Sequence, residues 1–191
     1  MKLILASQSP RRRELLGLLG IPFEIIVPNA DETMDPTQAP ARQVALVSRR
    51  KAEATPRDED TVVVAADTIV VCDGKILGKP RNAEDAVQML HLLSGRTHQV
   101  MTGLTVLYRD QVSSSTEVTE VTFRKLSQDE ILRYVRSGEP MDKAGAYGIQ
   151  GGAALFTQGI CGDYYNVVGL PVCRLVQALQ ETVPALMEDI R

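Results

Sequence analysis

The chain has 191 residues, of which 44% are hydrophobic and 24% are charged, and its formal net charge is −3. This composition is ordinary for a soluble globular protein of one compact domain or two small lobes, and it offers no basic field for duplex nucleic acid. With only His91 and His98 present, neither a histidine-rich zinc site nor a histidine base is expected. Any acid–base chemistry would rest on carboxylates, lysine and a hard metal ion. The sequence shows no signal-peptide segment and no apolar run of about 20 residues, which argues against a membrane span.

The spacing of apolar residues predicts strands that alternate with helices. Strands are expected over 2–6, 23–27 and 61–71, and helices over 10–20, 37–54 and 82–93. A tight hairpin is expected at 73–80, and two long strands within 97–125 are joined by a polar turn around 108–115. A helix over 127–138, a glycine-rich strand-and-turn region over 143–156 and a C-terminal helix complete the chain. The predicted fold class is α/β with a mixed sheet and flanking helices, in a single domain over 1–191.

The three cysteines are odd in number and far apart in the sequence. Cys72, Cys161 and Cys173 form no CxxC pair, and each lies in an apolar context. We expect reduced, buried thiols and a cytoplasmic protein.

The segment SQSPRRREL, residues 7–15, places cations where a helix disfavours them. Ser9 fits the N-cap and Pro10 the first helical position, so Arg11, Arg12 and Arg13 fall in the first turn. Each cation there costs about 0.3–1 kcal/mol against the helix dipole. The arginines are accounted for if the helix N-terminus binds several phosphates. A solvated basic turn is the alternative.

Two acids are candidates for catalysis or metal binding. Asp67 lies inside the apolar run VVVAADTIVV, where a carboxylate is costly unless it is paired, hydrogen-bonded or bound to a metal. It is either a structural aspartate at a bulge, bonded to Thr68, or a base or metal ligand at a strand end that opens onto a cleft. Glu32 follows the second strand and is either a surface residue or a second acid of the same site.

Further candidates are weaker when taken singly. Lys51 and Lys79 are surface lysines or phosphate ligands, and Gln150 could read a base edge with an amide that both donates and accepts. The glycines around Gln150 would permit close approach of the backbone to a ligand. As a set, these residues suit a nucleoside polyphosphate with a hard metal between phosphate and carboxylate.

These motifs occur together in one known family. SQSPRRREL, Glu32, Lys51, AADTIV, LGKP, DKAGAYGIQG and GDYYNVVGLP resemble the Maf family of nucleotide pyrophosphatases, in the family's order, from residue 3 to about 180. The resemblance implies a two-lobed fold similar to the inosine triphosphate pyrophosphatases, with the active cleft between the lobes. It implies hydrolysis of a nucleoside triphosphate to the monophosphate and pyrophosphate, with a divalent cation (Mg²⁺, Mn²⁺ or Co²⁺). It also implies a cytoplasmic homodimer that binds neither nucleic acid polymers nor membranes.

The resemblance also implies roles for individual residues. Asp67 corresponds to the general base, and Glu32 and Asp67 to the metal-side acids. The phosphate contacts correspond to Ser7, Arg12, Arg13, Lys51 and Lys79.

Three positions indicate the substrate branch within the family. Arg11, Thr68 and Gln150 match the branch that acts on dTTP and UTP. The branch that prefers 7-methyl-GTP has an aromatic residue, Gln and Glu at these positions, and a Glu suits a cationic methylated base. The alternatives are the 7-methyl-GTP activity, modified pyrimidine triphosphates, or a non-catalytic nucleotide-binding regulator of cell division.

Overall fold

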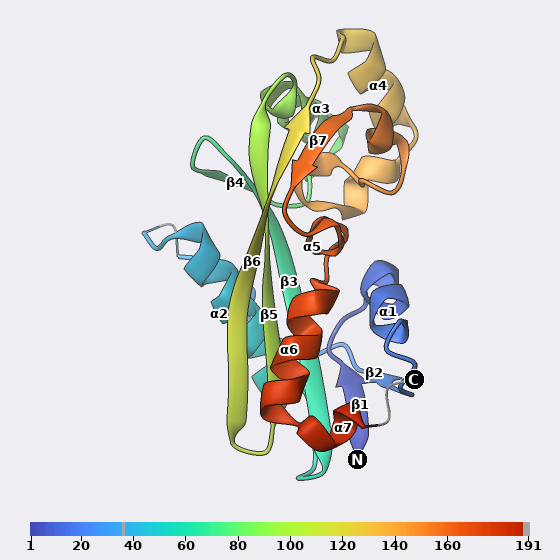
Figure 1. The fold of residues 1–191 in the computed structure, drawn as a ribbon. Helices are drawn as coiled ribbons and strands as arrows, with labels where there is room; N and C mark the ends of the chain where they lie inside the picture. The colour runs from blue at the N-terminus through green and yellow to red at the C-terminus, as the bar shows by residue number, and fades with distance from the viewer. Residues whose placement is uncertain (36, 189–191) are drawn as a thin grey trace. The chain divides into compact units, whose positions relative to one another are not determined.

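A computed structural model describes residues 1–35 and 37–188, and it has the predicted α/β architecture (Figure 1). The strands form a mixed seven-stranded sheet in the order β2-β1-β3-β5-β6-β7, with β4 paired to β3. The strands are β1 (Lys2–Leu5), β2 (Glu24–Ile25), β3 (Thr61–Cys72), β4 (Lys75–Leu77), β5 (Thr97–Tyr108), β6 (Gln111–Phe123) and β7 (Thr157–Cys161). The helices are α1 (Pro10–Gly17), α2 (Pro40–Glu53), α3 (Ala83–Leu93), α4 (Gln128–Arg136), α5 (Tyr164–Val168), α6 (Val172–Thr182) and α7 (Pro184–Met187).

The chain divides into two compact units. Each of the long strands β3, β5 and β6 contributes residues to both units. Unit 1 contains Met1–Asp67, Thr102–Glu117 and the residues from Gly169 onward. Unit 2 contains Thr68–Met101 and Val118–Val168.

In unit 1, helices cover both faces of the sheet (Figure 1). On one face, Ser48 of α2 shares a hydrogen bond of 2.8 Å with Thr105 of β5, which in turn contacts Ser114 of β6 at 3.0 Å. On the other face, Arg174 of α6 donates to the hydroxyl of Ser115, the next residue of β6, at 3.3 Å. Successive strand residues point to opposite faces, so α2 and α6 lie on opposite sides of the sheet. Gly103 lets α2 approach β5, because a Cβ there would lie 2.2 Å from the Val44 carbonyl oxygen.

Unit 2 is built around a cluster of aromatic rings. His98 lies edge-to-face against Phe123 at 4.9 Å and against Tyr147 at 5.4 Å between ring centroids. Phe156 joins the cluster through Phe123 and through Tyr134. His98 Nε2 is 2.8 Å from the Tyr147 hydroxyl, and burial lowers the pKa of His98 to about 4. The imidazole is therefore a neutral core group.

Most predicted elements are confirmed, with shorter ends in several places. Ser9 caps α1, Asn82 caps α3, and Ser127 and Glu130 form a capping box at the start of α4. The helix predicted over 10–20 ends at Gly17, the helix predicted over 37–54 begins at Pro40, and the strand predicted over 23–27 is reduced to Glu24–Ile25.

The hairpin predicted around 108–115 is confirmed with a narrower turn, the strand predicted within 143–156 is wrong, and one strand was missed. The polar turn around 108–115 is confined to Arg109 and Asp110, because Arg109 adopts a φ of 52° and the serines that follow continue β6. The region 143–156 contains no strand but 3₁₀ helices at Ala144–Ala146 and Gly152–Leu155, preceded by another at Glu139–Asp142. Strand β7, which lies at the end of the sheet order and is exposed along most of its length, was not predicted, because its sequence lacks alternation.

The cysteine prediction holds only in part. All three thiols are free, and burial raises the pKa of Cys72, but Cys161 and Cys173 are exposed. The exposed β7 carries Cys161, and the first turn of α6 carries Cys173.

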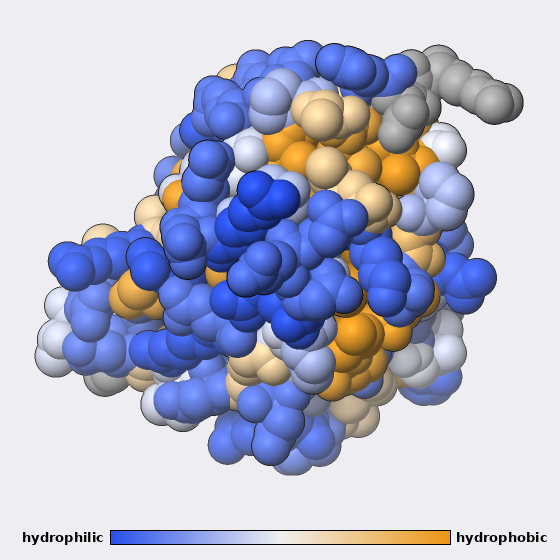
Figure 2. Space-filling view, turned by 90° about the horizontal axis from the view of Figure 1, so that it is seen from below, coloured by the Kyte–Doolittle hydropathy of each residue, from blue (hydrophilic) through white to orange (hydrophobic). Residues whose placement is uncertain are grey.

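The surface seen from below is mostly hydrophilic, with separate hydrophobic areas (Figure 2). Among the described residues, no helix combines the length and the apolar character that crossing a membrane requires.

Candidate active site

Segments of unit 1 that are far apart in the sequence end at the same edge of the sheet. Strand β1 pairs in parallel with β2 and with β3, so Leu5 lies opposite both Ile25 and Val64. Ser7 lies two residues after the end of β1, and Asp67 lies beyond Val64 on β3. The carboxyl ends of parallel strands are where α/β proteins place their ligands. The topology therefore places Ser7 and Asp67 at this part of the sheet.

An ammonium group lies between two carboxylates at this edge. Lys51 Nζ is 2.7 Å from Asp67 Oδ1 and 3.1 Å from Glu32 Oε1. The Lys51 and Asp67 side chains are only 11% and 15% exposed, whereas Glu32 is 62% exposed. Three of the predicted site residues are therefore in direct contact, and the carboxylate inside the apolar strand is paired.

Helix α2 explains how a lysine comes to lie in this interior. Its buried stripe includes Val44, Val47 and Lys51, at the spacing that faces the sheet. Lys51 therefore occupies a core-facing position in the last turn. Helical spacing was the signal that separates it from a surface lysine.

Arg12 lies beside the same acids. Its partners explain why a cation is retained in the first turn of α1. Its Nε donates to the Gly169 carbonyl oxygen at 2.8 Å, and Nη1 donates to Ser7 Oγ at 3.4 Å. Burial lowers the pKa of the guanidinium, while the charges of Asp67 and Glu32 act in the opposite direction. A half-buried arginine held by a carbonyl group and two nearby carboxylates is retained despite the helix dipole.

The neighbouring arginines differ in exposure. Arg11 is half-buried and Arg13 is exposed, and α1 has no acidic residue in its first turn. Gly169 was missed as a partner of Arg12, because a main-chain carbonyl 157 residues away leaves no local sequence signal.

The other predicted residues belong to unit 2. Thr68 follows Asp67 in β3 and is half-buried, whereas Lys79 and Gln150 are both exposed. The Gly145 N–H donates to the Gly78 carbonyl oxygen at 3.0 Å, which ties the Gln150 segment to the Lys79 segment.

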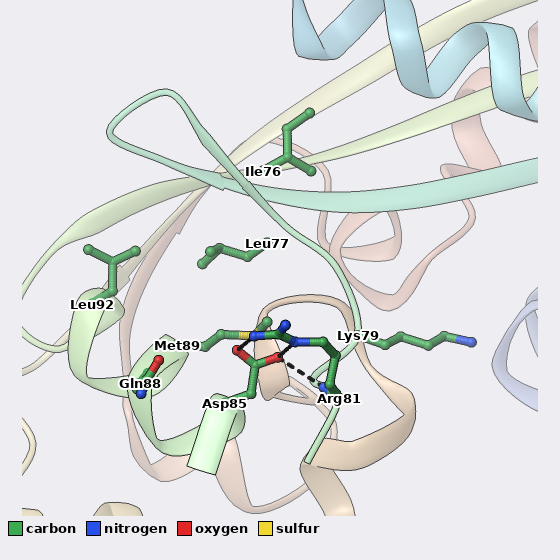
Figure 3. Close-up of a pocket in the computed structure, with 8 residues that line it drawn as sticks. All are labelled: Ile76, Leu77, Lys79, Arg81, Asp85, Gln88, Met89 and Leu92. Atoms are coloured by element: carbon green, nitrogen blue, oxygen red, sulfur yellow. Dashed lines mark hydrogen bonds and ion pairs between the residues drawn. The ribbon is translucent and has the colours of Figure 1, made fainter. Parts of the chain in front are cut away.

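A cavity of about 410 Å³ lies beside Lys79 in unit 2, between β4 and α3 (Figure 3). Figure 3 shows Lys79 extending away from the Arg81–Asp85 ion pair, whose closest atoms are 3.2 Å apart. The remaining lining is largely apolar, from Ile76, Leu77, Met89 and Leu92 together with Gln88. Because Arg81 is already paired and the Lys79 ammonium points away, this cavity does not bring cations together for phosphate.

The glycines around Gln150 lie close to side chains of unit 2. A Cβ on Gly151 would lie 2.1 Å from Glu139 Oε1, and a Cβ on Gly152 would lie 3.0 Å from the Tyr134 ring. A Cβ on Gly145 would collide with Val70. The glycines make room for side chains of the protein itself.

The donor set suits a hard divalent cation. Among the described residues, no group of three or more His, Cys, Asp or Glu side chains that could hold a metal is present. Glu32 and Asp67 nevertheless converge on a single cation, the Lys51 ammonium. Mg²⁺ is commonly bound by one or two carboxylates together with phosphate oxygens, so this pair fits such an ion.

The fold is thus that of an α/β protein. Beyond the point where the parallel pairing of β1 and β3 ends, unit 1 holds a paired carboxylate, an ammonium group and a guanidinium, which suit phosphate chemistry. The family model of the Maf-like proteins matches residues 2–182. The chain belongs to the Maf-like protein family.

Curated relatives are similar over most of their length. Proteins named dTTP/UTP pyrophosphatase from Bacillus cereus (strain AH820) and Bacillus anthracis are each 51% identical over 181 residues, which is 94% of this chain and 95% of theirs.

Solved structures share the fold at low sequence identity. The HAM1 protein from Coxiella burnetii has a TM-score of 0.52 at 15% identity and covers 95% of this chain and 99% of its own. The Ham1 protein of Staphylococcus aureus has a TM-score of 0.51 at 14% identity, covering 95% and 98%. These likenesses confirm the predicted fold class.

Proposed function

We propose that the protein hydrolyses dTTP and UTP to the monophosphate and pyrophosphate. The observation that carries the proposal is the contact of Lys51 with Asp67 and Glu32 beside Arg12, beyond the point where the parallel pairing of β1 and β3 ends. Relatives that are 51% identical over 94% of the chain and are named dTTP/UTP pyrophosphatase support the choice of reaction.

In this proposal Asp67 is the general base. Its carboxylate takes a proton from water as the water oxygen attacks the α-phosphorus, and the bond from that phosphorus to the bridging oxygen breaks to release pyrophosphate. Negative charge accumulates on the phosphate oxygens in the transition state, and cations held in fixed positions stabilise it. Positioning and electrostatics supply most of the catalysis in phosphoryl chemistry. We assign this role to Arg12, Arg13, Lys51 and Lys79, with Ser7 as a hydrogen-bonding contact.

Glu32 and Asp67 would hold the divalent cation. When bound, Mg²⁺, Mn²⁺ or Co²⁺ neutralises phosphate charge and polarises a phosphoryl oxygen. Lys51 already contacts both carboxylates, so it keeps them close together before substrate binds.

Gln150, with Arg11 and Thr68, is assigned to recognition of the base. The exposed amide of Gln150 can donate to the O4 of a pyrimidine and accept from its N3–H. CTP presents an amino group and an unprotonated N3 at these positions, so it leaves polar groups mismatched. Such a mismatch gives about ten- to hundredfold discrimination.

Pyrophosphate release from a panel of natural and modified triphosphates, with Mg²⁺, Mn²⁺ and Co²⁺, tests the proposal. We expect kcat/KM to be highest for dTTP and UTP, and Gln150→Glu to lower both while CTP changes little. A preference for 7-methyl-GTP would contradict the assignment of the base. Binding without turnover of any triphosphate would favour the non-catalytic regulator.

We further propose that the enzyme acts in the cytoplasm as a homodimer. Size-exclusion chromatography with light scattering tests the assembly, and a monomer at micromolar concentration would contradict it.

A further inference from the structure

The loop that carries Gln150 is a tight turn with only one side chain directed to solvent at its tip. The Gly151 N–H donates to the Gly148 carbonyl oxygen at 3.0 Å, which closes a four-residue turn with Ile149 and Gln150 at its centre. Ile149 is 7% exposed and anchors the turn in the core, whereas Gln150 is exposed. The direction of the Gln150 side chain therefore depends on how firmly the two ends of the turn are held.

A tyrosine and a carboxylate hold both ends. At one end, the Gly148 N–H donates to the Tyr134 hydroxyl oxygen at 3.0 Å. At the other end, the Gly152 N–H donates to Glu139, at 3.0 Å to Oε2 and 3.2 Å to Oε1. The Tyr134 hydroxyl in turn donates to Glu139 Oε1 at 2.9 Å, so the two ends are linked through one continuous network.

The network is itself fixed to rigid parts of unit 2. Tyr134 lies on the buried face of α4, is 7% exposed and packs edge-to-face on Phe156 at 5.1 Å. Glu139 begins the following 3₁₀ helix, and its carbonyl oxygen accepts from Lys143 Nζ at 2.7 Å. Hydrogen bonds to an ionised acceptor are stronger than neutral ones, so the carboxylate gives the loop a defined position.

The loop sequence is adapted to this carboxylate. A Cβ on Gly151 would overlap Glu139, and a Cβ on Gly152 would press on Tyr134. At both positions glycine avoids moving the side chains that hold the turn.

We propose that Glu139 and Tyr134 are positioning residues that fix the Gly148–Gly152 turn and so preorganise Gln150 for recognition of the pyrimidine base. We call Tyr134 and Glu139 together the clamp. The expected effect on kinetics rests on the proposed function, whereas the clamp itself does not. Preorganisation matters because a polar contact discriminates between bases only if its geometry is held before the base arrives.

Two variants separate the clamp from simple folding effects. Glu139→Gln keeps the size of the side chain, but it removes the charge and leaves a single acceptor oxygen for both the Gly152 N–H and the Tyr134 hydroxyl. Tyr134→Phe keeps the buried ring and removes the hydroxyl that links Gly148 to Glu139. Glu130→Gln is the matched control, because Glu130 also accepts a backbone N–H, from Ser127 at 2.9 Å, and its ion-pair partner is Arg124, outside the turn.

Hydrogen exchange of the free protein tests the clamp without any nucleotide. We expect the Gly148 and Gly152 amides to exchange about tenfold or more faster in Glu139→Gln than in wild type, and the control to be unchanged there. Unchanged exchange at both glycines would overturn the clamp. If wild type released pyrophosphate from no triphosphate, the proposed function would fail, but the exchange result would still decide this point.

Kinetics test the consequence for specificity. The ratio of kcat/KM for dTTP to that for CTP should fall about fivefold or more in Glu139→Gln and in Tyr134→Phe, mainly through dTTP. In a Gln150→Ala background, the same changes should leave the ratio unaltered, because the side chain being positioned is gone. Equal losses on dTTP and CTP, or an undiminished effect without Gln150, would show that Glu139 only stabilises the fold and would overturn the proposal.

Discussion

Replacing Lys51 by Met removes the cation that joins two carboxylates and keeps most of the apolar stem. Breaking one side of a fully buried ion pair costs about 3–5 kcal/mol. Here the Lys51 and Asp67 side chains are 11% and 15% exposed, and the positive charge of Arg12 acts on Asp67. Because the pair is partly exposed and Arg12 remains near Asp67, the free energy of unfolding should fall by only about 2 kcal/mol. A loss of that size lowers the Tm of a chain of this length by about 4–8 °C.

Differential scanning calorimetry and urea unfolding at pH 7.5 measure this loss. The control is Arg49→Met on the same helix, which breaks an ion pair with Glu53 whose side chains are 49% and 46% exposed. The control should change stability by about 0.5 kcal/mol or less. Adding Asp67→Asn to Lys51→Met removes the uncompensated charge and should restore part of the loss. A Lys51→Met protein that melts at the same temperature as Arg49→Met would show that Lys51 and Asp67 are not a buried, energetically coupled pair.

Two further predictions concern Arg12 and His98. Arg12→Ala loses the 2.8 Å bond to the Gly169 carbonyl group, so the free protein should lose about 1–2 kcal/mol of stability, although the helix dipole alone predicts a gain. Arg13→Ala, in the same turn but exposed, should not lower the Tm, and equal losses in the two variants would contradict the role of the carbonyl contact. The pKa of His98 is about 4 in the fold, below its ordinary value of 6.5, so the unfolded chain binds the extra proton between these values. Stability is complete above about pH 6.5, is lost as pH falls toward 4, and is lower by about 1.4 kcal/mol at pH 5.5. Urea unfolding at pH 7.5 and 5.5 should show this slope in wild type and in His91→Gln, and a slope that persists in His98→Gln would disprove its origin.

Local sequence signals predicted the elements that have local causes. Ser9 and Pro10 begin α1, Asn82 begins α3, and an apolar run forms β3. The edge strand β7 and the 3₁₀ helices after Gly138 could not be predicted, because they depend on pairing with β6 and on packing rather than on periodicity.

The candidate site could also be predicted only in part. The cost of burying Asp67 pointed to a partner, but the apolar run did not say that Lys51 would supply it. Glu139 and Tyr134 were missed, because their contacts with the turn join residues 13 and 14 positions apart through a fold that the sequence pattern does not reveal.

The most direct test of Asp67 as the general base is a comparison of Asp67→Asn with wild type on dTTP. We expect steady-state pyrophosphate release to fall by about 10²-fold or more, because the amide cannot accept the proton from water. A second expectation concerns binding: dTTP should still raise the Tm of the variant, because the phosphate-binding cations remain. Near-normal turnover by a folded Asp67→Asn protein would contradict the account.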